Sequence, residues 1–512
     1  MPVRVLVADK ANSHEHLVTA INASIPLFSK STNLIGDSTL SLYDTQDWAL
    51  SLSGHFVETQ SFFNNSTTIS IFSDLKTPSR FSLIADEGSP EVIHLSKVKE
   101  VGVRRLLEQL AGERSLVKMA SIPTFITEIE LSQQNTGLKV GKVRLITPRG
   151  LPEQWIEIEL TAGIDPALIL TRIKKTLKSH LISNTNWDRW ASVMRSGKRK
   201  RFDYNQLGRT SYSLKDTPLA ALKTMAMNLY QRVNMNLDGV VRDYDLEYCH
   251  DVRVDLRKLR VIMEHLQHLA TKGSPAKKCH LKQLENEVKR FQTLCGTQRD
   301  LDVFLNTFST VETNENDLLT ETIKQLTSQR DAAHKILADY INGKQLVDLL
   351  NSWKTSFQCL EQQMAPNVKG QKISNFADHS IFTTYKDFVA QTQRTVSSST
   401  YEEMHNLRKK GKHLRYTLEL FQPVFSAVPF RAAVRELKVT QDLLGAFQDK
   451  EVAFCLLHNL PSTSSSDLQL IKQVDDERES LFRLCMAQAR QLQAAGGIKG
   501  FDLLFKELKK RP

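Results

Sequence analysis

The sequence reads His250-Asp-Val-Arg253-Val-Asp-Leu-Arg257-Lys258-Leu-Arg260 near its middle, and a second version follows at His405-Asn-Leu-Arg408-Lys409-Lys-Gly-Lys412-His413-Leu-Arg415. In both copies a His is followed by cations at offsets +3, +7 and +10. These four positions share an arc of about 80° on one face of a helix. Ten residues of helix rise about 15 Å. Each copy therefore predicts a cationic helix face suited to a ligand with regularly spaced negative charges. We call the two faces the His250 stripe and the His405 stripe.

Both copies also carry apolar residues at a second set of matching offsets. These residues are Val252, Leu259, Met263 and Leu266 in the first copy, and Leu407, Leu414, Leu418 and Phe421 in the second. Each helix is therefore expected to bury one face and present its cations on another. At offset +6 the copies differ, and Gly411 should weaken the second helix by about 1 kcal/mol relative to Ala. A single basic helix face could be ordinary solvated surface, but two matching copies favour a shared function.

The repeat extends on both sides of the stripes. Downstream, Glu, Lys, Gln, Gly, Asp, an acid and Val match in one register between residues 287–303 and 436–452. Upstream, Thr217-Pro218 is a typical helix start, with an N-cap followed by a Pro at the first helical position. The second copy has an amphipathic run with Phe382, Tyr385, Phe388 and Val389. Residues 212–512 are predicted to form two homologous helical bundles, about 212–350 and 375–512, related by a pseudo-two-fold axis.

The two stripes and the two matching blocks downstream of them, at residues 287–303 and 436–452, resemble the conserved-histidine α-helical domain, CHAD. The resemblance implies two helical bundles around a basic central groove, and it implies binding of inorganic polyphosphate. The groove residues that it implies are His250, Arg253, Arg257, Lys258, Arg260, Lys289, Arg299, His405, Arg408, Lys409, Lys412, Arg415 and Lys438. Lys412 stands where the first copy has Arg257, and Gln448 stands where it has Arg299. The second half is therefore expected to bind less strongly.

The first part of the chain has a different pattern. Short alternating or β-branched runs at residues 3–7, 67–71, 81–84, 125–131, 142–146 and 155–160 predict a mainly antiparallel sheet or barrel. Helices are expected at about 97–114 and 165–181. The fold class is therefore α+β and multidomain, with an antiparallel β barrel or tunnel-like domain at 1–195, a linker at 196–211 and an all-α domain at 212–512. The linker contains the cluster Lys198-Arg-Lys-Arg201, expected as a solvated connector, with contact to an anionic ligand as the alternative.

Two runs of the first domain resemble the CYTH triphosphate-tunnel family. They are the Tyr43-Asp44-Thr45 segment that leads to Gly54, and the acidic strand Trp155-Ile-Glu157-Ile-Glu159. The family's first strand carries alternating Glu that hold a divalent metal, but this chain has Val3-Arg-Val-Leu-Val there. The family's two phosphate-binding Arg correspond to Glu58 and Gln60. Because these losses would strip one wall of the tunnel of its ligands, we expect a degenerate domain, a pseudo-enzyme without catalytic or metal-binding residues.

Four acids of this domain remain as possible metal donors: Glu128, Glu130, Glu157 and Glu159. Alternating Glu on a strand are more often its solvent-facing side. No cofactor is therefore expected, and Mg²⁺ would be required only if a triphosphatase site had been rebuilt from these acids.

Composition limits the remaining possibilities. The formal net charge is +11 over 512 residues, and six cysteines are scattered without a Cys-x-x-Cys pair. This cysteine usage favours a reducing compartment without a zinc site or a disulfide framework. No signal-like or membrane-spanning apolar run is found, so we expect a cytoplasmic protein, with polyphosphate granules as a candidate location.

Three functions of different classes remain open. The first is a polyphosphate-binding protein, which could act beside a polyphosphate-handling enzyme. The second is a metal-dependent triphosphatase with a rebuilt site. The third is a nucleic-acid-binding protein, which is disfavoured because the stripes lack the interleaved aromatic residues that stack on bases. For His250 and His405, a hydrogen bond to phosphate and a purely structural role are both open, and neighbouring cations should keep each imidazole neutral.

Overall fold

The computed structural model describes residues 3–9, 13–25, 28–62, 67–72, 83–85, 90–160, 166–179, 181, 188–197, 199–208, 212–270, 275–308, 318–358, 371–458 and 465–508. The chain forms two compact units, residues 1–206 and residues 207–512. Among the helices within these ranges, none is both long and apolar enough to cross a bilayer. The described cysteines, Cys249, Cys295, Cys455 and Cys485, are free thiols.

The first unit is built on one antiparallel sheet. Its strands are β1 (Val3–Asp9), β2 (Phe28–Asp44), β3 (Phe56–Phe62), β4 (Thr67–Phe72), β5 (Leu83–Ala85), β6 (Val92–Ile93), β7 (Leu116–Gln133), β8 (Lys139–Pro148) and β9 (Glu153–Leu160). They follow the order β1-β9-β8-β7-β2-β3-β4-β5, and β6 pairs with β7. The predicted antiparallel β domain is thus confirmed. Within the described strands the sheet is open, because β1 and β5 are its two ends.

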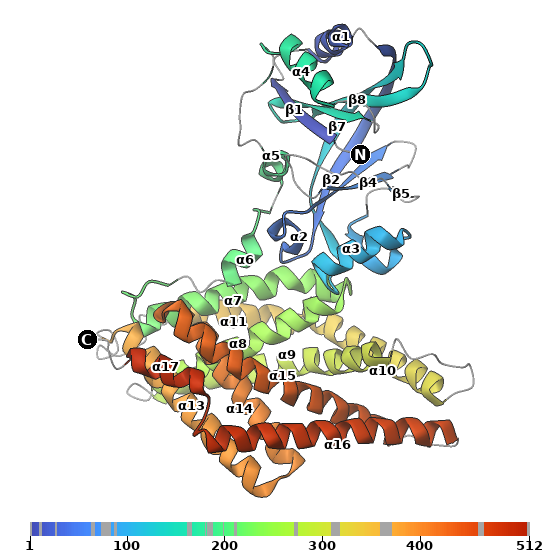
Figure 1. Ribbon diagram of the computed structural model, residues 1–512. Coiled ribbons are helices and arrows are strands. Elements are labelled where there is room, and N and C mark those ends of the chain that lie inside the picture. The colour runs from blue at the N-terminus through green and yellow to red at the C-terminus, as the bar shows by residue number, and fades with distance from the viewer. Residues whose placement is uncertain are drawn as a thin grey trace. The chain divides into compact units, whose positions relative to one another are not determined.

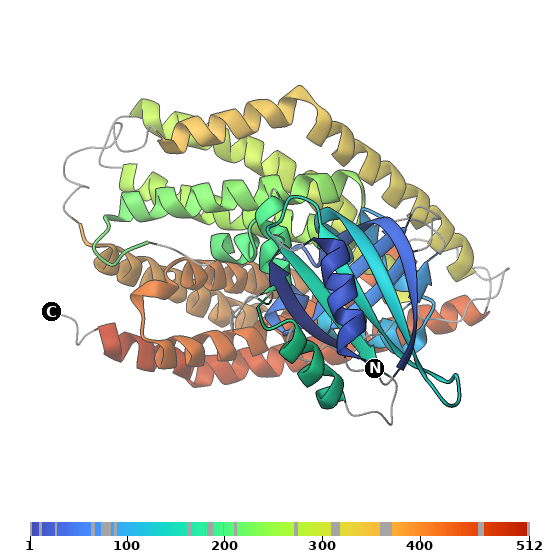
Figure 2. The same ribbon diagram turned by 90° about the horizontal axis from the view of Figure 1, so that it is seen from above.

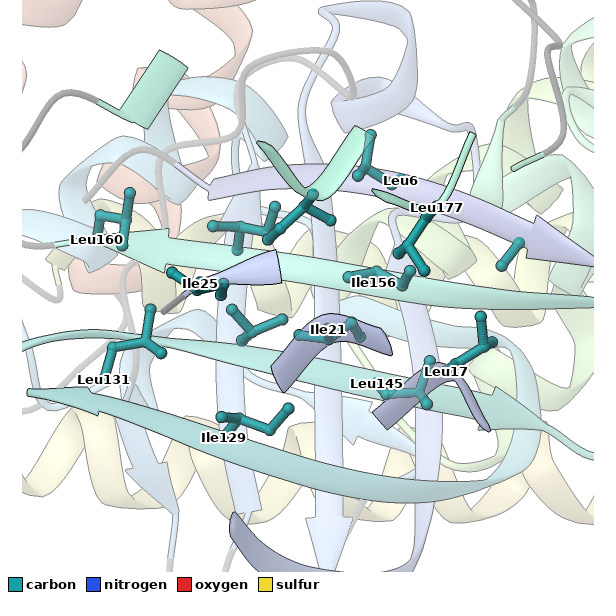
Figure 3. Close-up of a cluster of buried hydrophobic side chains, with 14 of the residues drawn as sticks. Leu6, Leu17, Ile21, Ile25, Ile129, Leu131, Leu145, Ile156, Leu160 and Leu177 are labelled. Atoms are coloured by element: carbon teal, nitrogen blue, oxygen red, sulfur yellow. The ribbon is translucent and has the colours of Figure 1, made fainter. Parts of the chain in front are cut away.

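Helices cover this sheet through two apolar clusters. The helices α1 (His14–Ser24) and α4 (Pro166–Thr176) contact each other, and Leu17, Ile21 and Ile173 belong to one cluster with residues of β1, β7, β8 and β9 (Figure 3). A second cluster joins α3 (Val101–Ala111) to β2, β3 and β4. The helices expected at 97–114 and 165–181 correspond to α3 and α4. The sequence pattern did not predict α1 or β2, because much of β2 is exposed and rich in Ser and Thr, without a regular apolar alternation.

The second unit contains two sets of helices (Figure 1). The first set is α7 (Pro218–Val241), α8 (Leu246–Ala270), α9 (Pro275–Phe308), α10 (Leu318–Asn342) and α11 (Lys344–Gln358). The second set is α13 (Ile373–Ser398), α14 (Tyr401–Leu420), α15 (Ala427–His458), α16 (Ser465–Ala494) and α17 (Lys499–Leu508). As expected, Thr217 caps α7, accepting a hydrogen bond at Oγ1 from the Ala220 backbone N–H, and Pro218 follows it.

The two sets are related as the repeat predicts. Equivalent helices contact each other across the unit: α7 with α13, α8 with α14 and α9 with α15. Figure 2 shows the long helices of the first set, in green and yellow, beside those of the second set, in orange and red. The predicted pair of pseudo-symmetric helical bundles is confirmed. The two stripes lie on α8 and α14, which meet between the bundles.

Part of the basic cluster expected as a solvated connector is held against other groups. Arg199 pairs with Asp203 at 2.8 Å and donates to the Gln46 side chain. Arg201 pairs with Asp188 at 2.5 Å. Asp188 is the N-cap of α5 (Arg189–Ser196), and Asp203 begins α6 (Asp203–Gly208). These two arginines are therefore held by the acids at the starts of α5 and α6. Lys198 lies outside the described residues.

Candidate functional site

The two stripes meet in one cavity of about 280 Å³ between the bundles. It is formed by α8, α9, α14 and α15, so each repeat contributes the same two helices. Its lining is His250, Arg253, Val254, Arg257, Arg299, Asp300, Val303, Phe304, His405, Arg408, Lys412, Gln448, Asp449, Val452 and Ala453. Seven of the thirteen residues implied by the resemblance are among them: His250, Arg253, Arg257, Arg299, His405, Arg408 and Lys412.

Helical periodicity explains why these side chains reach the cavity. On α8, Val252, Leu256 and Leu259 are fully buried, which fixes the rotation of the helix about its axis. The positions at offsets 0, +3 and +7 of the His250 stripe then face the cavity together. The same positions of the His405 stripe face it from α14. The cavity ends against apolar packing, because its lining residues Phe304 and Ala453 also belong to a hydrophobic cluster.

The cavity carries more positive than negative charge. Five of its lining side chains are cationic (Arg253, Arg257, Arg299, Arg408 and Lys412), and two are carboxylates (Asp300 and Asp449). Arg253 pairs with Asp300 at 3.0 Å, and Arg299 pairs with Glu247 at 3.1 Å. Among the described residues, Arg257, Arg408 and Lys412 form no ion pair. Two of these three unpaired cations come from the second repeat, the half that was expected to bind less strongly.

Desolvation and like charges shift the protonation of the lining groups. Burial, aided by Arg299 and Arg257, lowers the pKa of His250 to about 4, so its ring is neutral at pH 7. Burial and the cations Arg408, Arg257, Arg253 and Arg415 lower the pKa of Lys412 to about 7. Burial also lowers the pKa of Arg253 and of Arg408. The cavity therefore holds its cations together at an electrostatic cost that an anion would relieve.

Unsatisfied donors are a second sign of a site for an anion. Within the part of the chain that the structure describes, the buried Nε atoms of Arg253, Arg299 and Arg408 have no hydrogen-bond partner. Buried donors usually have a partner, and guanidinium N–H groups match the oxygens of phosphate. His405 differs from His250 because its Nδ1 is hydrogen-bonded to Oε1 of Gln448, which orients the ring. Gln448 thus has a structural role that its replacement of an Arg did not suggest.

Six of the implied residues lie outside the cavity lining. Lys258 pairs with Glu419 at 2.8 Å, and Arg415 pairs with the same Glu419 at 2.9 Å and donates to Gln441. Arg260 donates to Gln292 and lies 3.7 Å from Glu285. The other three, Lys289, Lys409 and Lys438, are exposed side chains away from the lining.

Two polar contacts connect the stripes on either side of the pseudo-axis, one an ion pair and one a hydrogen bond. Lys258 of α8 pairs with Glu419 of α14, and His413 of α14 lies 2.9 Å from Glu264 of α8. Lys258 and His413 occupy equivalent positions of the repeat, and so do Glu264 and Glu419. The +8 position of each stripe therefore joins the bundles instead of facing the cavity.

The structure adds cavity residues to which the sequence assigned no role. Asp300 and Asp449 match in the repeat, but a matched acid inside a cationic site was not expected there. Phe304 and Ala453 are also equivalent positions, one large and one small, so the apolar end of the cavity is asymmetric. The sequence signal that could have identified these cavity residues is the Asp-x-x-Val pattern, which occurs downstream of each stripe at residues 300–303 and 449–452.

The first unit has a different interior. Arg189 of α5 is buried between Glu58 and Glu157, with a nitrogen 2.5 Å from an oxygen of each carboxylate. It also lies over the rings of Phe72 and Trp155, at 5.5 and 5.4 Å from their centroids. The remaining space beside it is a cavity of only about 20 Å³. The guanidinium therefore fills the interior where the family resemblance implies metal and phosphate.

The acids that remained as possible metal donors all have cationic partners. Glu157 pairs with Arg189, and Glu128 pairs with Arg144 at 2.7 Å. Glu159 and Glu130 pair with Lys142 and Lys139 respectively. A carboxylate neutralised by a nearby cation is a poor ligand for a divalent metal. These residues do not fit the metal that the CYTH resemblance would imply.

Comparisons with known proteins bear on the helical unit. Residues 224–458 match the family model of the CHAD domain. Among solved structures, the CHAD domain from the plant Ricinus communis is 21% identical, covers 59% of this chain and 96% of its own, and gives a TM-score of 0.43. PptA from Streptomyces chartreusis is 14% identical, with coverages of 56% and 99% and a TM-score of 0.36.

A third similar structure is HpAC1 from Hippeastrum, described as having a dominant triphosphatase activity. It is 15% identical, with coverages of 40% and 99% and a TM-score of 0.26. No match was found among curated proteins. The family match falls on the helices that carry both stripes and the cavity between them. Residues 224–458 of this chain therefore belong to the CHAD family.

Proposed function

We propose that this protein binds inorganic polyphosphate in the cavity between its two helical bundles. The observation that carries the proposal is the meeting of both stripes in one cavity, where Arg257, Arg408 and Lys412 form no ion pair with any residue that the structure describes. Cations held together at the cost of desolvation favour a ligand with several closely spaced negative charges. Polyphosphate supplies one such charge per repeating unit, with oxygen acceptors for the unsatisfied guanidinium donors. Gathering at polyphosphate granules, or beside an enzyme that acts on polyphosphate, would follow from this binding.

The same geometry argues against nucleic acid as the ligand. Proteins that bind single strands without sequence preference combine basic grooves with several aromatic platforms for the bases. Phe304 is the one aromatic lining residue of this cavity other than the two His, and it is 3% exposed. A linear phosphate chain needs no such platform.

We also propose that the first unit is non-catalytic and acts as a structural or regulatory domain. The support is the Arg189–Glu58–Glu157 cluster, which occupies the interior with the chain's own side chains. Addition of Mg²⁺ or Mn²⁺ should therefore release no phosphate from tripolyphosphate. Metal-dependent release that is lost in Glu157→Gln would overturn this part of the proposal.

The test of polyphosphate binding uses two variants of equal net charge. The first replaces Arg257, Arg408 and Lys412 with Gln, and the second replaces the exposed Lys289, Lys409 and Lys438 with Gln. Each removes three positive charges from the formal +11. We expect the first variant to lose binding of long-chain polyphosphate by 100-fold or more, on the order of 1–3 kcal/mol for each charge-assisted contact. The second should bind nearly as the unmodified protein does.

Titration of labelled polyphosphate, with RNA as competitor, measures both effects. Circular dichroism and the midpoint of thermal unfolding check that each variant is folded. Equal losses in the two variants would show that overall charge, not the cavity, attracts the ligand. Easy displacement of polyphosphate by RNA would favour nucleic acid as the natural ligand.

A further inference from the structure

Lys412 is the one lysine among the cationic residues that line the cavity. It is half-buried on α14 and lines the cavity, and among the described residues it forms no ion pair. Its equivalent in the first repeat is Arg257, which keeps its charge at any pH that a protein tolerates. At offset +7, therefore, only the second stripe has a cation that can release its proton.

Most of the charged groups around Lys412 are cations, and they come from α8, α9 and α14 itself. The charged and titratable groups there are His250, Arg253 and Arg257 from α8, Arg299 and Asp300 from α9, His405, Arg408 and Arg415 from α14 itself, and Asp449 from α15. Asp300 is engaged by Arg253. Asp449 is the acid left to offset Arg408 and Lys412 together. Like charges and desolvation thus act together on one ammonium group.

An anion in the cavity would reverse this balance. Phosphate oxygens beside the ammonium group favour its protonated form, as any opposite charge within about 4–6 Å does. We propose, building on the proposed polyphosphate site, that ligand binding is coupled to uptake of a proton by Lys412, so that the affinity for polyphosphate falls as the pH rises above neutrality.

The sign of the effect follows from linkage. The pKa of Lys412 in the free protein is lowered to about 7. Below this pH the free protein already carries the proton, so binding takes up none and affinity does not depend on Lys412 titration. Above it, the complex holds a proton that the free protein lacks. The affinity then falls by up to about tenfold per pH unit until the higher pKa of the complex is reached.

His250 and the arginines of the cavity do not titrate in this range. His405 also lines the cavity, but it is unchanged in every variant compared, so any proton that it binds is common to all of them. His250, with its pKa lowered to about 4, is neutral throughout. The arginines keep their charge. The ends of a polyphosphate chain take up protons near neutrality themselves, but this contribution is the same for every variant and is small for a long chain.

The experiment is calorimetric titration of the full-length protein with long-chain polyphosphate at pH 6.0, 7.0, 8.0 and 9.0. At each pH, two buffers of different ionisation enthalpy give the number of protons taken up. The unmodified protein should take up close to one proton per cavity at pH 8 and almost none at pH 6. Lys412→Arg keeps the positive charge at all these pH values, and the Arg already present at the equivalent position shows that the fold accommodates this change. It should show neither the uptake nor the loss of affinity.

Lys409→Arg is the matched control, because Lys409 lies on the same helix but is exposed and outside the lining. It should take up the same number of protons as the unmodified protein. Equal uptake in the Lys412→Arg variant would overturn the coupling while leaving polyphosphate binding established. Absence of binding in all three proteins at pH 6 would instead overturn the proposed function, and the coupling with it.

Discussion

Arg189 shows how one residue can decide the chemistry of a whole interior. Its guanidinium lies in the interior of the first unit, where it donates hydrogen bonds to two carboxylates and packs over two aromatic rings. Burial and the neighbouring Glu157 raise the pKa of Glu58, and the nearby Arg189 opposes that rise. At positions 58 and 60, where the CYTH resemblance implies Arg, the chain has Glu58 and Gln60, and Arg189 of α5 balances the charge of Glu58.

We expect Arg189→Met to lower the free energy of unfolding of the first unit by about 3–5 kcal/mol, because it leaves two buried carboxylates without a partner. Urea unfolding followed by tryptophan fluorescence measures this change, since four of the five tryptophans (Trp48, Trp155, Trp187 and Trp190) belong to residues 1–206.

The control for this prediction is Arg149→Met, which removes an exposed pair with Asp37 and should cost no more than about 1 kcal/mol. Adding Glu58→Gln and Glu157→Gln to Arg189→Met should recover part of the loss, because neutral amides need less compensation. A similar small loss for Arg189→Met and Arg149→Met would show that the buried cluster contributes little.

At the scale of elements, two glycines show how closely the helices of the bundles approach one another. Gly239 of α7 faces the ring of Tyr248 on α8, and a Cβ built there would lie 2.2 Å from a ring carbon. Gly411 of α14 is also buried, but a Cβ there would meet Phe388 of α13 at 3.4 Å, an ordinary contact distance. The carbonyl of Gly411 accepts a hydrogen bond from Gln441 of α15. Only Gly239 is required by the packing.

The prediction is a difference in sign between two identical substitutions. Gly411→Ala should raise the free energy of unfolding of the helical unit by about 0.5–1 kcal/mol, because Ala restricts the unfolded chain and favours helix. Gly239→Ala should lower it by about 1–3 kcal/mol through overpacking against Tyr248. Thermal unfolding followed by the helical signal in circular dichroism compares the two. Destabilisation by Gly411→Ala would mean that α14 has no room to adjust at Phe388.

At the scale of the helical unit, the repeat places equivalent polar contacts around the pseudo-axis. Lys258–Glu419 and His413–Glu264 are one such set. Arg232–Asp255 and Lys410–Asp387 are another, and in that set the charges are exchanged between the repeats. The geometry of the bundles is thus retained while the chemistry at single positions diverges. The same divergence gives the two halves of the cavity different charge. Of the three lining cations that form no ion pair among the described residues, Arg408 and Lys412 belong to the second repeat.

The positive charge gathered in the cavity should make the affinity for polyphosphate depend on the salt concentration. The logarithm of the binding constant for polyphosphate should fall linearly with the logarithm of the salt concentration, as it does when phosphates of nucleic acids release counterions. Removing Arg257, Arg408 and Lys412 should reduce the slope by about 2–3, close to one unit per lost contact. The same measurement on the Lys289, Lys409 and Lys438 variant should leave the slope nearly unchanged. Equal reductions would place the ligand on the general surface.

The sequence by itself determined the helices that carry the repeat and the identity of their stripes. Periodicity fixes which residues of one helix share a face, so His250, Arg253 and Arg257 could be grouped without a structure, and the repeat gave the matching group on α14. The antiparallel character of the first unit followed in the same way from alternation along β7, β8 and β9. The missed elements include α1, β2 and β3, and the Ser- and Thr-rich β2 has no regular apolar alternation from which it could have been predicted.

Only the tertiary structure decided which cations are available to a ligand. Lys258, Arg260 and Arg415 lie on the same helices as the cavity residues, yet they are engaged by Glu419, Glu285 and Gln441. Periodicity cannot predict this, because the partners of a charged side chain lie on other helices, at positions set by packing. The lowered pKa of Lys412 and the buried position of Arg189 have the same origin, since desolvation depends on everything that surrounds a group in space.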